Sequence, residues 1–158
     1  MRAILLSALA LSLSAGCGSD DSTAPAPMGT ASLNFSISNG ARQNPGLVDP
    51  LKGAVYGSLF KSEEVTLAGP IDGAADVASV EVGSVDLVAV APSAERWSSP
   101  KLPPGMYTFL GFFDVDGNGA ASKDPDAGDP VTLPLTNKFE VTADETVEFE
   151  VQFDLIFN

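Results

Sequence analysis

A short segment in the C-terminal half of the chain concentrates acidic side chains. Five aspartates and a single basic residue, Lys123, occur in residues 114–129, which read DVDGNGAASKDPDAGD. Calcium takes six to eight oxygen ligands at about 2.3–2.6 Å, and alternating acids on a tightly turning chain bring their oxygens toward one point. A divalent cation would also relieve the repulsion among like charges held in one ordered loop. The segment therefore predicts a calcium site.

The beginning of this segment resembles the EF-hand calcium loop, whose first six positions follow the pattern D-x-[DN]-x-[DN]-G. The glycine of that pattern is Gly119, which allows a sharp bend. The resemblance ends at position twelve, because Pro125 stands in place of the bidentate glutamate. The flanking sequences are strand-like rather than helical, so the loop would be grafted onto a β domain. The expected ligands are oxygens of this one loop: Asp114, Asp116, Asn118, Ala120, Asp124, Asp126 and Asp129.

A solvated acidic turn without an ion is the alternative, because Asp-Gly and Asn-Gly are ordinary turn-forming pairs. Magnesium fits the segment less well than calcium, since it demands octahedral geometry and retains water. Zinc is disfavoured because the chain has no histidine and only one cysteine. No nucleophile or general base stands beside the acids, so we expect the ion to have a structural role.

Composition argues against several function classes. Without histidine, neither a Ser–His–Asp triad nor a Cys–His pair can form. Glycoside hydrolysis needs a pair of carboxylates, but the spacing of Glu63, Glu64, Glu81 and Glu95 does not support one. The formal net charge of −13 disfavours nucleic acid as a partner, since binding phosphates requires Lys and Arg. We therefore expect a protein that is not an enzyme.

Residues 1–16 have the pattern of a cleaved secretion signal. Arg2 precedes an apolar run that is too short to form a stable membrane anchor. Small residues then lead to Cys17, the only cysteine of the chain. The sequence LSAGC resembles the lipobox of bacterial lipoproteins, in which the cysteine carries the lipid, although Ser14 stands where a leucine is usual. A plain secretory signal cleaved nearby is the alternative.

The lipobox resemblance implies lipidation of Cys17. Because Gly18 rather than aspartate follows, it also implies delivery to the cell outer membrane. Several acyl chains hold a protein firmly where one chain would be marginal. Residues 17–29 then comprise the lipidated cysteine and a short, polar, proline-containing tether. The expected partners are the membrane, reached through this lipid, and a protein or glycan that the sequence does not identify.

Residues 30–158 are expected to form one all-β domain. Apolar and polar side chains alternate in residues 31–38 and 145–157, which predicts half-buried strands, the second in an antiparallel sheet. Residues 105–113 are apolar on both faces, which indicates a central strand. Weaker strands are expected at 53–61, 63–68 and 137–141.

A further strand is expected within residues 77–90, where the apolar phase slips across Gly83. A glycine at such a slip is typical of a β-bulge or bend. Frequent proline and glycine turns separate these segments. The pattern predicts a single antiparallel β-sandwich of about 7–8 strands.

The turn and strand entry LPPGMY, residues 102–107, resembles the same feature of transthyretin-like (prealbumin-like) and carboxypeptidase-regulatory-like β-sandwich domains. Several secreted bacterial members continue that strand into a D-x-D-G-N-G loop, as this chain does at 114–119. The resemblance covers only this part of the domain. It implies a small accessory or binding module and no particular reaction.

Trp97, the only tryptophan, lies in a polar stretch before the Pro-Pro turn. An exposed tryptophan stacks on sugar rings or anchors a protein partner, whereas a packed one covers an edge of the core. Our leading hypothesis is a non-catalytic binding or accessory module of the cell envelope with a structural calcium loop. The alternatives are a structural subunit of an envelope assembly that uses a sheet edge, and a carbohydrate-binding module that uses Trp97.

Overall fold

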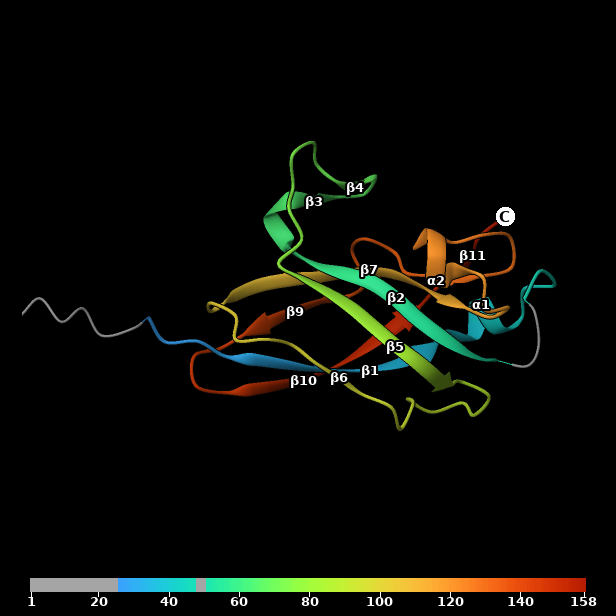
Figure 1. Ribbon diagram of the computed structural model, residues 1–158, viewed down its shortest axis with the longest axis horizontal. Coiled ribbons are helices and arrows are strands. Elements are labelled where there is room, and N and C mark those ends of the chain that lie inside the picture. The colour runs from blue at the N-terminus through green and yellow to red at the C-terminus, as the bar shows by residue number, and fades with distance from the viewer. Residues whose placement is uncertain (1–25, 48–50) are drawn as a thin grey trace, which may run out of the picture.

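The structure, a computed structural model, describes residues 26–47 and 51–158 (Figure 1). The expected signal segment, Cys17 and the first part of the expected tether lie outside the described residues. Within the described ranges, no helix is long and apolar enough to cross a membrane.

Two sheets pack against each other. The smaller sheet contains β1 (Thr30–Ile37), β6 (Trp97–Ser98) and β10 (Thr146–Phe153). The larger sheet contains β2 (Lys52–Lys61), β5 (Ala78–Asp86), β7 (Gly105–Asp114), β8 (Pro130–Val131), β9 (Lys138–Val141) and β11 (Leu155–Ile156). The strand orders are β10-β1-β6 and β11-β8-β7-β2-β5, with β9 paired to β7 beside that path. The predicted all-β sandwich is confirmed.

The remaining elements connect these strands. The short strands β3 (Val65–Thr66) and β4 (Gly69–Pro70) form a hairpin that stands away from the sandwich (Figure 1). Three short helical turns occur in the described residues: α1 (Asn39–Arg42), η1 (Ser62–Glu64) and α2 (Gly119–Ser122). The prediction of a strand at 63–68 was therefore wrong in part. The chain leaves the larger sheet through η1, and only Val65–Thr66 of this segment form a strand, β3 of the hairpin.

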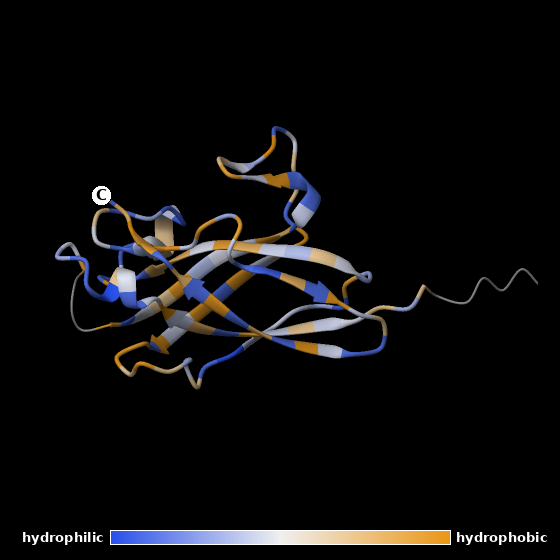
Figure 2. Ribbon diagram, turned by 180° about the vertical axis from the view of Figure 1, so that it is seen from behind, coloured by the Kyte–Doolittle hydropathy of each residue, from blue (hydrophilic) through white to orange (hydrophobic). Residues whose placement is uncertain are grey.

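The main core lies between the two sheets and follows the predicted alternation (Figure 2). Leu33, Phe35 and Ile37 of β1 are all buried in it. The Phe35 ring packs against the rings of Phe109 and Phe153, with a centroid separation of 6.3 Å in each case. Because these rings come from β1, β7 and β10, they join the two sheets across the centre of the sandwich.

β7 is the central strand, as its two apolar faces predicted. It pairs with β2 from Tyr107 to Asp114 and with β8 and β9 on the other side. Phe109 and Phe113 face the main core, whereas Phe112 faces outward and packs with Tyr56 in a second, smaller apolar cluster. Both faces of β7 are therefore covered by other parts of the chain.

Gly57 of β2 and Gly111 of β7 are directly paired across the larger sheet. A Cβ atom would lie 2.7 Å from Phe109 Cζ at Gly57, and 2.6 Å from the same atom at Gly111. The ring of Phe109 therefore occupies the space above both glycines. A side chain at either position would displace this fully buried ring.

The bulge predicted at Gly83 is confirmed. Gly53 pairs with Val85 and Val55 pairs with Val82, so Ala54 stands opposite two residues, Gly83 and Ser84. The extra residue restores the inward direction of the apolar side chains, because Val80 before the bulge and Val85 after it are both buried.

The last long strand differs from the prediction in its direction. β10 pairs with β1 in parallel, in a continuous register from Thr30↔Thr146 to Ile37↔Phe153. Alternation of polar and apolar residues shows which face of a strand is buried, and a parallel strand with one solvated face alternates just as an antiparallel one does. In the described residues, the two sheets of the sandwich also contain more strands than expected, because β6, β8 and β11 are short strands of two residues each.

Candidate functional site

The acidic segment forms the connection between β7 and β8. Asp114 is the last residue of β7, and Asp129 immediately precedes β8. Both carboxylates are buried, with exposed fractions of 1% and 0%. We call residues 114–129 the Asp loop. Its two ends are therefore fixed by acidic side chains inside the protein, and its middle lies at the surface.

The Asp114 carboxylate holds the first turn of the Asp loop. Its Oδ1 accepts a hydrogen bond from the backbone N–H of Gly117 at 2.8 Å, and its Oδ2 accepts one from Gly119 at 3.0 Å. Gly117 adopts a φ of 82°, in the left-handed region that favours glycine. At Gly119, a Cβ atom would lie 2.8 Å from the Phe112 ring. Each glycine is thus required for a different reason.

The Asp129 carboxylate holds the other end of the loop. Its two oxygens accept backbone hydrogen bonds from Val115 and Asp126, each at 3.1 Å. Burial raises the pKa of Asp129, the two backbone hydrogen bonds lower it, and the nearby charges of Asp126 and Asp114 raise it further. Burial is the largest of these effects, so the pKa of Asp129 lies above its ordinary value although two backbone hydrogen bonds hold the carboxylate.

The Asn118 amide joins two carboxylates at the surface of the loop. Its Nδ2 donates to Asp116 Oδ2 at 2.8 Å and to Asp126 Oδ2 at 2.5 Å. The backbone N–H of Asn118 also donates to Asp116 Oδ1 at 3.2 Å. Residues from the beginning and the end of the Asp loop therefore meet at one amide group.

Five of the seven expected ligands are thus brought together: Asp114, Asp116, Asn118, Asp126 and Asp129. Asp124 is exposed, and its backbone N–H donates to Ser122 Oγ. Ala120 is an exposed residue of α2. In the ranges that the structure describes, no three acidic side chains form a group ready to hold a metal. The side-chain oxygens would have to move before they could surround an ion.

Lys123 ties the Asp loop to the larger sheet, a contact that the sequence did not predict. Its ammonium lies 2.9 Å from Glu81 Oε2 on β5 and 4.0 Å from the centroid of the Tyr56 ring on β2. Its backbone φ of 59° is left-handed. No local pattern identifies such a contact, because its three residues are far apart in the sequence.

Trp97 is half-buried and packs against the main core, opposite Leu33 of β1. One side of its ring therefore covers the edge of the sandwich, as the second of its two predicted roles requires.

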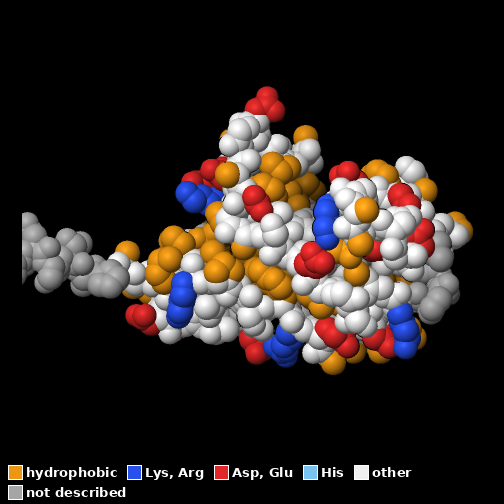
Figure 3. Space-filling model, viewed as in Figure 1, with side chains coloured by type: hydrophobic (Ala, Val, Ile, Leu, Met, Phe, Trp, Pro, Cys, Tyr) orange, Lys and Arg blue, Asp and Glu red, His pale blue; other side chains and the backbone are white. Residues whose placement is uncertain are grey.

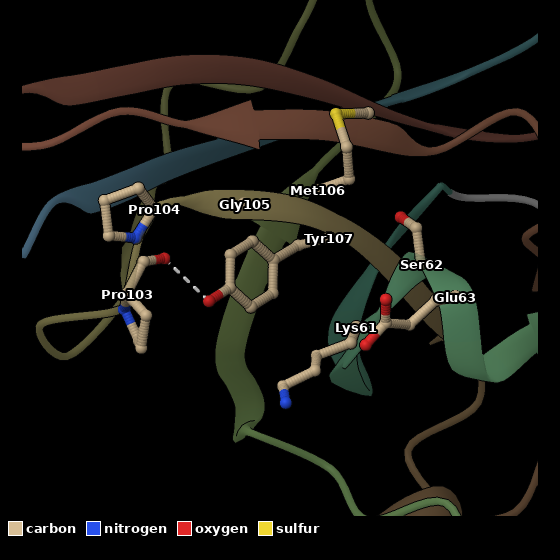
Figure 4. A pocket seen from close by; sticks show the side chains of 8 residues that line it. All are labelled: Lys61, Ser62, Glu63, Pro103, Pro104, Gly105, Met106 and Tyr107. Atoms are coloured by element: carbon tan, nitrogen blue, oxygen red, sulfur yellow. Dashed lines mark hydrogen bonds between the residues drawn. The ribbon is translucent and has the colours of Figure 1, made fainter.

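A pocket of about 610 Å³ lies where β2 ends and β7 begins (Figure 4). The Tyr107 ring stands between the Pro103–Pro104 turn and η1, and its hydroxyl donates to the Pro103 carbonyl at 2.8 Å. Burial raises the pKa of Tyr107. Because this hydroxyl is already engaged, Tyr107 fixes the turn, and the ionisable groups left at the pocket are Lys61 and Glu63.

A second hollow, of about 530 Å³, lies on the outer face of the larger sheet. We call it the outer groove. Phe60, Leu110 and Phe112 are among its lining residues, together with Pro70 of the hairpin and Pro125 of the Asp loop. Figure 3 shows hydrophobic side chains gathered between the hairpin and the lobe that contains α2.

Comparison with known proteins gives no relative for this chain. No protein-family model, curated protein or solved structure matches it.

Proposed function

We propose that this chain is a non-catalytic, lipid-anchored module of the cell envelope whose Asp loop binds one calcium ion. The observation that carries the calcium proposal is the Asn118 amide, whose NH₂ group lies between the carboxylates of Asp116 and Asp126. An amide NH₂ has two donors and a positive partial charge. The two carboxylates make the position between them favourable for a cation. In this structure the NH₂ group, which is only weakly positive, occupies that position.

Calcium binding at this position requires one local change. Rotation of the Asn118 side chain turns its Oδ1, an acceptor, toward the ion in place of Nδ2. Asp116, Asn118 and Asp126 would then supply oxygen ligands from both halves of the loop. All three residues are exposed, so this rotation disturbs no core packing.

Asp114 and Asp129 are buried beneath the proposed site and hold the backbone that carries it. Their four carboxylate oxygens hold four backbone N–H groups, which fixes the turns that carry the exposed ligands. Each carboxylate oxygen retains a second lone pair, and both groups add negative charge. Burial is the main reason that the pKa of Asp129 is raised, and the charges of Asp126 and Asp114 raise it further. A bound cation would offset these neighbouring charges and make both ends of the loop more rigid.

Thermal unfolding of residues 19–158 tests the calcium proposal. All the core residues and hydrogen bonds described above belong to Met28 or later residues, so this shorter protein retains them. A ligand at a hundredfold excess over its dissociation constant stabilises the native state by about 2.7 kcal/mol. For a domain of this size, we expect millimolar calcium to raise the unfolding midpoint by roughly 5–15 °C relative to chelator.

Two variants separate calcium binding from general stability. Asp116→Asn should abolish the calcium shift. Its own midpoint in chelator is the reference, because the substitution alters the hydrogen bonds that Asp116 accepts from Asn118. The matched control is Asp72→Asn, which removes an exposed acid outside the loop and should retain the full shift. An unchanged midpoint of the unmodified protein with both calcium and magnesium would show that the Asp loop is a solvated turn.

The anchor proposal rests on the residues around Cys17. Loss of residues 1–16 would remove Arg2 and no acid, so the mature chain would be more acidic than the full one. Growth of expressing bacteria with radiolabelled palmitate should label the protein and direct it to the outer-membrane fraction. Cys17→Ser should lose the label, and a labelled Cys17→Ser protein would contradict lipidation at this residue.

A further inference from the structure

Lys123 is the only basic residue of the Asp loop, but its ammonium group is bound outside the loop. It lies 2.9 Å from Glu81 Oε2 on β5 and 4.0 Å from the centre of the Tyr56 ring on β2. Among the ion pairs of the described residues, none joins Lys123 to an aspartate of its own loop. The loop therefore keeps its excess of negative charge although it carries a cation.

Three exposed carboxylates of the same loop compete for this ammonium group. Asp124 follows Lys123 directly in the sequence. Asp116 and Asp126 lie on either side of the Asn118 amide. Lysine carries its charge on a flexible four-carbon stem, and a group attached to the same loop has a high effective concentration at its neighbours. Without other contacts, Lys123 would pair with these acids and neutralise part of the charge that attracts a calcium ion.

The larger sheet fixes the two groups that hold Lys123. Tyr56 and Glu81 are directly paired across β2 and β5, so their side chains lie side by side on one face of the sheet. Tyr56 is 7% exposed, and its ring packs on that of Phe112 with a centroid separation of 5.6 Å. The binding position for the ammonium group therefore belongs to the sandwich and not to the Asp loop.

We propose that Glu81 and Tyr56 are positioning residues for the calcium site. They hold the Lys123 ammonium away from the acids of its own loop and so keep those acids available to the ion. This inference rests on the calcium site proposed above. Without Glu81, Lys123 turns toward the loop, and calcium must displace it in order to bind. The affinity for calcium should then fall by about two- to fivefold, the effect of one exposed ion pair.

Isothermal titration of residues 19–158 with calcium chloride tests the inference through a double-mutant cycle. Glu81→Gln should lower the affinity by the factor given above. Lys123→Gln added to Glu81→Gln should restore the affinity at least to that of the unmodified protein, because the competing cation is gone. In the presence of Glu81, Lys123→Gln should have a smaller effect. The matched control is Glu148→Gln, which removes the same charge on the smaller sheet, breaks a 2.9 Å ion pair with Arg96 and should leave the affinity unchanged.

The effect of Lys123→Gln with and without Glu81 distinguishes a positioning role from a simple effect of charge. If Glu81 acted only through its own negative charge, Lys123→Gln would change the affinity by the same factor in both cases. That result would overturn the inference and leave the calcium site intact. Absence of calcium binding by the unmodified protein would refute the calcium site, and the inference with it.

A measurement without calcium locates the Lys123 side chain directly. An aromatic ring moves the NMR signals of protons that lie over its face to lower frequency. The ε-methylene protons of Lys123, next to the ammonium over the Tyr56 ring, should show this shift in the unmodified protein. Glu81→Gln should reduce the shift, and Glu148→Gln should not. A full shift retained in Glu81→Gln would show that Glu81 does not hold Lys123, and would overturn the inference.

Discussion

The ammonium of Lys123 lies 4.0 Å from the centre of the Tyr56 ring and 2.9 Å from the carboxylate of Glu81. One side chain of the Asp loop thus contacts two strands of the larger sheet. Exposed ion pairs stabilise proteins by about 0–1 kcal/mol, and cation–π contacts at exposed sites add about 0.5–1 kcal/mol. The left-handed backbone of Lys123 opposes this gain.

Two substitutions at Lys123 separate these effects. Lys123→Ala loses both side-chain contacts and keeps the unfavourable φ, so we expect its unfolding free energy to fall by about 0.5–2 kcal/mol. Lys123→Gly loses the same contacts but relieves the backbone strain, and should be more stable than Lys123→Ala. Urea unfolding of both variants measures the difference. Equal stabilities would show that relief of the left-handed φ gains no more than the extra backbone entropy that glycine loses on folding.

The raised pKa of Asp129 makes a pH-dependent contribution to stability. An acid whose folded pKa lies above its ordinary value of 3.8 binds more protons in the folded state. The contribution of Asp129 to the free energy of unfolding therefore falls as pH increases from 3.8 through the folded pKa. It remains low at pH values above the folded pKa. We expect the difference in unfolding free energy between wild type and Asp129→Asn, measured against pH without calcium, to decrease across this window. A difference that increases with pH would contradict a pKa of Asp129 that burial raises.

The paired glycines of the larger sheet tolerate no side chain. At Gly57, a Cβ atom would lie 2.4 Å from the Leu110 carbonyl oxygen as well as 2.7 Å from the Phe109 ring. Gly57→Ala should therefore destabilise the protein by about 1–3 kcal/mol, the usual cost of overpacking a core. Gly83→Ala is the control, because no atom lies within 4 Å of a Cβ at that bulge position. Chemical denaturation should show little change for Gly83→Ala.

The Asn137 side chain forms hydrogen bonds with the backbone of β10, in addition to the pairing of β10 with β1. Its Oδ1 accepts from the Gln152 N–H at 2.8 Å, and its Nδ2 donates to the Gln152 carbonyl at 3.0 Å. Asn137 is buried, so Asn137→Ala leaves both groups without this partner, and we expect a loss of about 1–3 kcal/mol for each group that water cannot reach. Asn137→Asp keeps the acceptor alone. Amide hydrogen exchange at Gln152 should become faster in Asn137→Ala than in Asn137→Asp.

Much of the fold could be predicted from periodicity. The buried face of β1, the central position of β7 and the bulge at Gly83 all follow from where apolar residues occur along one strand. The direction of β10 could not be predicted in this way. Alternation is the same for both directions, and the choice depends on where the chain returns after more than a hundred residues.

The Asp loop was predicted as a cluster, but not in its detail. Spacing placed Asp114, Asp116 and Asn118 in one turn, since close neighbours in a tight loop must meet. The burial of Asp129 and the contact of Lys123 with Tyr56 depend on the larger sheet, which the loop sequence does not contain. The outer groove also joins segments that are distant in sequence, so no local motif indicates it.

The parallel pairing of β1 with β10 also determines the order in which the protein can fold. The register joins Thr30 to Thr146, so the first long strand of the sandwich pairs with one that is made more than a hundred residues later. Its other neighbour, β6, is only two residues long. Contacts between such distant residues slow folding, because a long loop must close before they stabilise anything. If the chain is exported from its N-terminus, β1 will cross the membrane before β10 and remain without this main partner until residues 146–153 have followed. A chaperone that shields Leu33, Phe35 and Ile37 during this interval would protect the chain from aggregation.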